Sequence, residues 1–168
     1  MREIIFRGKR LDNGEWKEGY LYEHEPELVG IVSENDVPEP SKWFIARTAF
    51  ADWNMPRLPE FIEVDPSTVV QYTGLKDKNG KRIFEGDIVK SDNGAQSSIS
   101  VVKFGEYYPK MFYAMLDMCR PGMLHINANG FYLESYKHED MILFKSRHLV
   151  VIGNIYDNPE LFKEEAQT

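Results

Sequence analysis

The sequence predicts a mostly β fold in two lobes, and three observations support this. Short β-rich runs alternate with turn signals along most of the chain. Prolines at 56 and 59 end the one N-terminal stretch that could turn helically. The 168 residues are 42% hydrophobic and 13% aromatic, which is enough for a real core. We expect a mixed α+β N-terminal lobe over residues 1–65 and a β-rich C-terminal lobe over 66–168, together forming one compact structural unit.

The N-terminal lobe should begin with a β-hairpin over residues 3–22. Asp12-Asn13-Gly14 is a strong turn signal, because Asn-Gly accepts the positive φ that tight hairpins need. Further strands are predicted at 28–32, 41–45 and 61–64, and residues 46–55 could form a helical turn. Asp65 before Pro66 is typical of the first residues of a helix or turn, and we place the boundary between the lobes there.

The C-terminal lobe should be built from short strands separated by glycine-containing turns. Tyr72-Thr73-Gly74 and Lys78-Asn79-Gly80 indicate turns, and Glu85-Gly86-Asp87 indicates a corner that leads into a strand. The predicted strands are 87–91, 99–104, 111–116, 131–136, 141–144 and 149–156. Their near-regular spacing favours a small, strongly bent antiparallel sheet or barrel. A short helix is predicted over residues 158–162, with Pro159 at its first position.

Composition excludes several classes of protein. The chain has 27 acidic and 20 basic residues, a net charge of -7 and a pI near 5.2, which argues against a surface built throughout for phosphate backbones. Its single cysteine, Cys119, cannot form an intramolecular disulfide, which fits a reducing compartment. The sequence has no apolar run of membrane-spanning length and does not begin like a signal peptide, so we expect a cytoplasmic protein with no membrane contact.

Acidic residues and histidines are the obvious candidates for chemistry. Glu85, Asp87 and Asp92 surround one turn and could hold a divalent cation or share a proton. The plainer interpretation is structural: Gly86 permits the bend and Asp87 accepts backbone hydrogen bonds. The four histidines have neither zinc-protease spacing nor a cysteine pair, so surface roles are favoured over a metal site. They are His24, His125, His138 and His148.

Two basic clusters make nucleic-acid binding the alternative function. One lies on the first hairpin, with Arg7 and Arg10 among its members, and the other includes Lys76 beside the second turn. Trp16, Tyr20 and Tyr22 could stack on bases if they are exposed. Five glutamates between residues 15 and 27 would repel phosphate next to the first cluster. A dense methionine and aromatic segment over residues 107–116 could instead serve a protein interface.

Three segments resemble the YopX family of phage and prophage proteins. The central segment 70–89 reads VQYTGLKDKNGKRIFEGDIV, the opening 2–9 reads REIIFRGK, and the ending 151–161 reads VIGNIYDNPEL. The resemblance implies a phage- or prophage-encoded protein made in the bacterial cytoplasm. It also implies an α+β, mostly β architecture with a barrel-like C-terminal lobe. It implies no established activity and no catalytic residues.

The sequence therefore favours a non-enzymatic accessory protein that acts through protein contacts or self-association. A nucleic-acid-binding β module is the alternative, and a metal-dependent enzyme using Glu85, Asp87 and His138 ranks third. We expect no catalytic residues, no metal and no cofactor. The candidate binding residues are Arg7, Arg10, Trp16, Tyr72, Lys76, Glu85 and Asp87.

Overall fold

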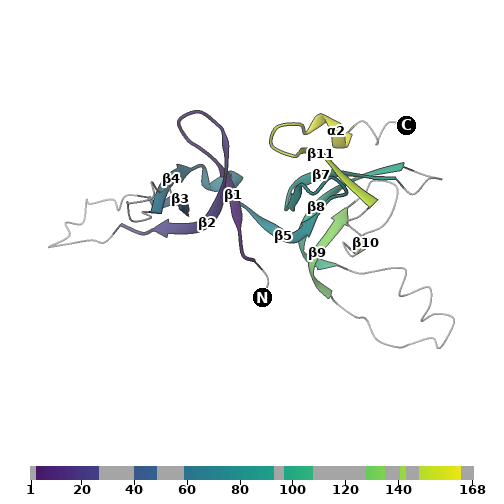
Figure 1. Cartoon of the computed structure of the whole chain (residues 1–168), viewed down its shortest axis with the longest axis horizontal. Helices are drawn as coiled ribbons and strands as arrows, with labels where there is room; N and C mark the ends of the chain where they lie inside the picture. The colour runs from purple at the N-terminus through teal and green to yellow at the C-terminus, as the bar shows by residue number, and fades with distance from the viewer. Residues whose placement is uncertain are drawn as a thin grey trace, which may run out of the picture. The chain divides into compact units, whose positions relative to one another are not determined.

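The computed structural model divides the chain into two compact units, Met1–Gln71 and Tyr72–Thr168 (Figure 1). It describes residues 3–26, 40–48, 59–92, 97–107, 128–134, 141–142 and 148–163. The described parts are mostly strand, and all strand pairs are antiparallel, as predicted for a mostly β fold. No described helix is long and apolar enough to cross a bilayer.

Unit 1 is an antiparallel meander that begins with the predicted hairpin. β1 pairs with β2, β2 with β3, and β3 with β4, while the first residues of β5 pair with the free side of β1. Gly14, with φ +70°, supplies the turn between β1 and β2. The strands of this unit are β1 (Phe6–Lys9), β2 (Trp16–His24), β3 (Lys42–Thr48), β4 (Pro59–Val64) and β5 (Val70–Lys76), which continues into unit 2.

The end of β4 returns to the end of β1. Val64 forms a β-bridge with Arg10, and the Asp65 N–H donates to the Lys9 carbonyl at 2.8 Å. Close packing requires a glycine at position 19, where a Cβ would lie 2.4 Å from the Ala46 carbonyl oxygen. Among the described residues of this unit, the buried hydrophobic side chains are aliphatic, namely Ile5, Ile45, Ile62, Val64 and Val70.

The helical element described in unit 1 is a single 3-10 turn, η1 (Pro66–Thr68). Asp65 caps it by accepting a hydrogen bond from the Ser67 N–H at 2.9 Å, which confirms the predicted Asp-Pro start. The predicted helical turn over 46–55 is wrong at its first residues, because 46–48 belong to β3. Residues 49–55 and the predicted strand 28–32 lie outside the described ranges.

Unit 2 contains a five-stranded sheet in the order β10-β9-β8-β7-β11. The last part of β5 forms a hairpin with β6 before this sheet begins. The elements are β6 (Arg82–Phe84), β7 (Asp87–Asp92), β8 (Ser97–Tyr107), β9 (Ala128–Glu134), β10 (Met141–Ile142), β11 (Leu149–Asn154) and the helix α2 (Glu160–Lys163). The predicted strand 111–116 lies outside the described ranges.

Two expectations for this unit are corrected. The Tyr72-Thr73-Gly74 segment is not a turn but lies inside β5, where Gly74 has φ +85°. Tyr72 pairs with Phe84 and Lys76 with Arg82, so β5 carries a bulge of two extra residues. The five-stranded sheet is open rather than a closed barrel, since the described strands β10 and β11 stand at its two edges.

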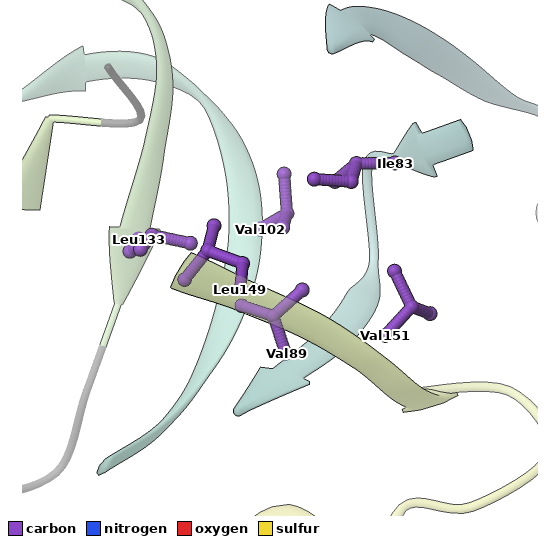
Figure 2. Packing of buried hydrophobic residues seen from close by; sticks show 6 residues of the cluster. All are labelled: Ile83, Val89, Val102, Leu133, Leu149 and Val151. Atoms are coloured by element: carbon purple, nitrogen blue, oxygen red, sulfur yellow. The ribbon is translucent and has the colours of Figure 1, made fainter. Parts of the chain in front are cut away.

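The core of unit 2 gathers short aliphatic side chains from five strands. Figure 2 shows Val102, Leu133 and Leu149 pointing toward a common centre. Ile83 of the β5–β6 hairpin is fully buried in the same cluster, so the hairpin is packed on the sheet by hydrophobic burial. The remaining members of the cluster are Val89 and Val151.

Candidate functional site

The predicted binding residues fall in two groups, one in each unit. Arg7, Arg10 and Trp16 lie in unit 1, and the other four lie in unit 2. The latter are Tyr72, Lys76, Glu85 and Asp87. Within the groups, Arg7 and Trp16 are brought into contact, whereas Tyr72 and Asp87 are buried in the fold with exposed fractions of 4% and 1%.

Arg7, Lys9 and Trp16 form a cation–π stack on the first hairpin. The guanidinium carbon of Arg7 lies 4.7 Å from the centre of the Trp16 ring, and the Lys9 ammonium lies 5.5 Å from it. Arg7 is only 8% exposed. The arrangement leaves little of the Arg7 charge for a ligand and stabilises the β1–β2 pairing.

Arg10 lies beside a shallow groove at the outer edge of β4. The groove has a volume of about 260 Å³ and is lined by Arg10, Leu11, Asp12 and residues 60–63. The Arg10 guanidinium pairs with the Asp12 carboxylate, which raises the pKa of the former and lowers that of the latter. Three of the lining side chains are acidic, and Leu11 is 59% exposed.

One face of the β2–β3–β4 sheet carries exposed aromatic rings. Tyr22 of β2 is paired with Phe44 of β3. Ala46 of β3 is paired with Tyr20 on one side and with Phe61 of β4 on the other. Paired residues point to the same side of a sheet, so the four aromatic side chains project from one face. The Tyr22 ring lies 5.5 Å from Phe61 in an edge-on contact and 6.2 Å from Phe44. We call Tyr20, Tyr22, Phe44 and Phe61 the aromatic face.

The sequence indicates only half of the aromatic face. It marks Tyr20 and Tyr22 as rings that could be exposed, whereas Phe44 and Phe61 fall in predicted strands with no sign of exposure. Only the register of β3 and β4 places them next to Tyr22, and no local signal reveals a register between strands. Phe61 is 52% and Tyr22 47% exposed, which is unusual for large rings that contact each other, and Tyr20 on the same face is 66% exposed.

In unit 2, Asp77 and Asp87 of the YopX-like segment 70–89 accept hydrogen bonds from backbone N–H groups. The Asp77 carboxylate accepts hydrogen bonds from the N–H groups of Asn79 at 2.8 Å, Lys81 at 2.9 Å and Val151 at 3.1 Å. Burial acts to raise the pKa of Asp77, but these hydrogen bonds outweigh it and hold the pKa below its ordinary value. Asp87 accepts from the Phe84 N–H at 2.8 Å and thereby closes the corner between β6 and β7.

Tyr72 and Lys76 lie at the two ends of the β5 bulge. The Tyr72 ring packs 5.5 Å from Phe84, and the Arg82 guanidinium lies 5.5 Å from the Tyr72 ring centre. Lys76 is exposed at the end of β5.

Glu85 differs from Asp77 and Asp87 because it lines a cavity. The cavity has a volume of about 170 Å³ and is lined by Glu85, Gly86, residues 101–104, Ile155 and Tyr156. Partial burial raises the pKa of Glu85, although a hydrogen bond from the Phe104 backbone acts in the opposite direction. Glu85 and Asp87 therefore do not converge on one acidic site.

Within the described ranges, no three His, Cys, Asp or Glu side chains are grouped as metal ligands would be. His24 stacks at 6.4 Å on Tyr22 at the edge of the aromatic face, and His148 is exposed. Cys119, His125 and His138 lie outside the described residues, as does most of the methionine and aromatic segment 107–116.

Comparison with known proteins identifies the family. A model described as YopX protein matches residues 42–163. Among solved structures, the chain is similar to protein EF1440 from Enterococcus faecalis, with 21% identity and a TM-score of 0.43 over 96% of this chain and 99% of that one. No curated protein matches. The family match includes both the central and the C-terminal segments that resembled YopX, and it covers most of the chain, which therefore belongs to the YopX family.

Proposed function

We propose that this YopX-family protein is a non-enzymatic accessory protein that binds a partner protein through the aromatic face of unit 1. The observation that carries the proposal is the cluster of Tyr22, Phe44 and Phe61, in which two rings stay about half exposed although they touch. Aromatic rings are enriched in protein interfaces, where they bury a large area at a small cost in side-chain entropy.

Charge favours a protein over a nucleic acid as the partner. Glu63 lies opposite Phe44 on the same face, and Glu18 continues the Tyr20 and Tyr22 row. Both side chains are exposed, and carboxylates beside stacking rings would repel phosphate. By the same alternation, Arg7 and Trp16 continue this row, but their cation–π contact and the 8% exposure of Arg7 leave little of that charge for phosphate.

The use of the family signature supports a role without catalysis. Asp77 and Asp87 accept backbone hydrogen bonds, while Gly80 and Gly86 supply positive-φ turns. Polar groups committed to the backbone are unsuited to acid–base chemistry. The family resemblance supports a phage or prophage origin, and the single cysteine supports a reducing bacterial cytoplasm.

A photo-crosslinking amino acid at position 20 tests this function. Tyr20 is the most exposed ring of the aromatic face, and replacing it should leave the fold intact. The matched control is position 4 in the same unit, where Ile4 is 57% exposed but precedes the first strand. Illumination in the producing bacterium should give one defined crosslinked protein from position 20 and none from position 4.

Mass spectrometry of the crosslinked product distinguishes the possible partners. The proposal is supported if the product is a second copy or another single protein and if Tyr22→Ser with Phe61→Ser abolishes it. Crosslinks to nucleic acid would establish the alternative function. A product that is unchanged in the double variant, with the fold verified by circular dichroism, would rule out the aromatic face.

A further inference from the structure

A cavity in unit 2 opens beside the corner between β6 and β7. Its lining combines one carboxyl group with apolar and aromatic side chains, among them Val101, Phe104, Ile155 and Tyr156. Phe104 is 50% exposed and Ile155 39%, so the cavity is continuous with solvent-exposed apolar surface. With a volume of about 170 Å³, it has room for a side chain or a small molecule and not for a large cofactor.

The corner itself does not need the Glu85 carboxyl. Gly86 has φ +73°, donates its N–H to the Val102 carbonyl at 2.8 Å, and accepts from the Ile155 N–H at 2.9 Å. Asp87 then accepts from the Phe84 N–H. These contacts complete the turn, and a neutral side chain at position 85 would leave all of them in place.

Glu85 is consequently a partly buried acid whose burial is a cost to the fold. It accepts a hydrogen bond from the Phe104 backbone, and loss of water raises its pKa. Lys103 lines the same cavity, but its ammonium pairs with the Glu134 carboxylate at 2.5 Å. A further cation that paired with Glu85 would offset the free-energy cost of removing its carboxylate from water.

We propose that this cavity binds a guanidinium or primary ammonium group carried on an apolar stem, with the Glu85 carboxylate as its counter-ion. The chemistry fits the side chains of arginine and lysine: the cation meets Glu85, and the stem packs on Phe104 and Ile155. The rings of Phe104 and Tyr156 add cation–π attraction to the pair. This site lies in unit 2 and does not depend on the aromatic face.

NMR titration of the full chain tests the site with defined probes. N-acetylarginine amide and N-acetyllysine amide should shift the backbone amides of Gly86 and Phe104 in a saturable way. N-acetylcitrulline amide has nearly the same shape without the charge and should bind at least about tenfold more weakly, since losing one ion pair of about 1.4 kcal/mol gives that factor. Gly14, in unit 1, provides an amide that should not move.

Two variants and a pH series complete the design. Glu85→Gln should weaken binding of the cationic probes at least tenfold, whereas Glu160→Gln, an exposed carboxylate of the same unit, should have no effect. Binding should strengthen as pH rises through the raised pKa of Glu85, because only the ionised carboxylate attracts the cation. Unchanged amide spectra outside the corner would show that Glu85→Gln is folded.

A third probe, 1,4-diaminobutane, shows whether the natural cation is a free amine or a side chain of a polypeptide. If it binds at least tenfold more tightly than both amino-acid amides, the natural ligand is a free amine; the reverse order assigns a side chain of a polypeptide. Equal shifts with the citrulline probe, undiminished binding in Glu85→Gln, or no saturation at tens of millimolar would each overturn the proposal.

Discussion

Replacing Asp77 with alanine should markedly destabilise unit 2. Its carboxylate accepts three backbone N–H groups and is 6% exposed. In the variant, water can reach the partly buried amides of Asn79 and Lys81, but the buried Val151 amide loses its acceptor. An orphaned buried donor costs about 1–3 kcal/mol, and hydrogen bonds to a charged group are worth about 1.5–3 kcal/mol each. We expect a total loss of about 4 kcal/mol.

That loss corresponds to a fall of roughly 8–16 °C in Tm for a chain of this size. Urea denaturation followed by far-ultraviolet circular dichroism gives the free energy of unfolding. Hydrogen exchange at the Val151 amide provides a local measurement. Asp77→Asn keeps one acceptor oxygen and should lose about half as much. The reasoning is wrong if Asp77→Ala keeps both its denaturation midpoint and the protection of the Val151 amide.

The pH dependence of the same residue provides a second check. The pKa of Asp77 is held below its ordinary value in the folded state, so its carboxylate stabilises the fold above the unfolded-state pKa. This stabilisation is lost as pH falls through the folded-state pKa. The stability difference between the wild type and Asp77→Asn should therefore shrink in acid.

Three further predictions concern the corner and the first sheet. Gly86→Ala should cost about 2–3 kcal/mol and Gly14→Ala about 1 kcal/mol in urea denaturation, since both require positive φ but only position 86 has side-chain atoms 3.3 Å from an added Cβ; equal losses would contradict the crowding argument. Glu85→Gln should be more stable than the wild type at neutral pH, because burial penalises only the ionised carboxylate. This gain in stability should vanish as pH falls below the raised pKa of Glu85. A gain that grows in acid would show that burial does not disfavour the Glu85 carboxylate. Gly19→Ala should cost more than about 3 kcal/mol, because its Cβ would meet the Ala46 carbonyl oxygen at 2.4 Å; tryptophan fluorescence reports this loss, and near-wild-type stability would refute the close packing.

Local features were readily predicted from the sequence, since each depends on residues a few positions apart. The hairpin turn at Gly14, the Asp65 cap and the start of β7 at Asp87 are where the patterns placed them. The Tyr72–Gly74 turn failed for an instructive reason. Glycine permits positive φ both in a turn and in a β-bulge, and only the pairing of β5 with β6 decides between them.

Contacts between distant segments could not be predicted in the same way. The Asp77–Val151 hydrogen bond joins residues 74 positions apart, and the open edges of the unit 2 sheet depend on which strands pair. The candidate binding residues show the same difference between local and long-range contacts. The Arg7–Trp16 contact follows from an ordinary hairpin, whereas the aromatic face and the Glu85 cavity require the register of neighbouring strands.

The bond from Val151 to Asp77 also bears on synthesis of the chain at the ribosome. The strand pairs of unit 1 all lie between residues 6 and 71, so each of them can form early during translation. In unit 2, β7 pairs with β11 on one side, and β11 is the last of the described strands to be made. Until then, the backbone edge of β7 is open to wrong pairing in the nascent chain. We therefore expect the two units to fold at different times, with unit 2 waiting until β11 has been synthesised.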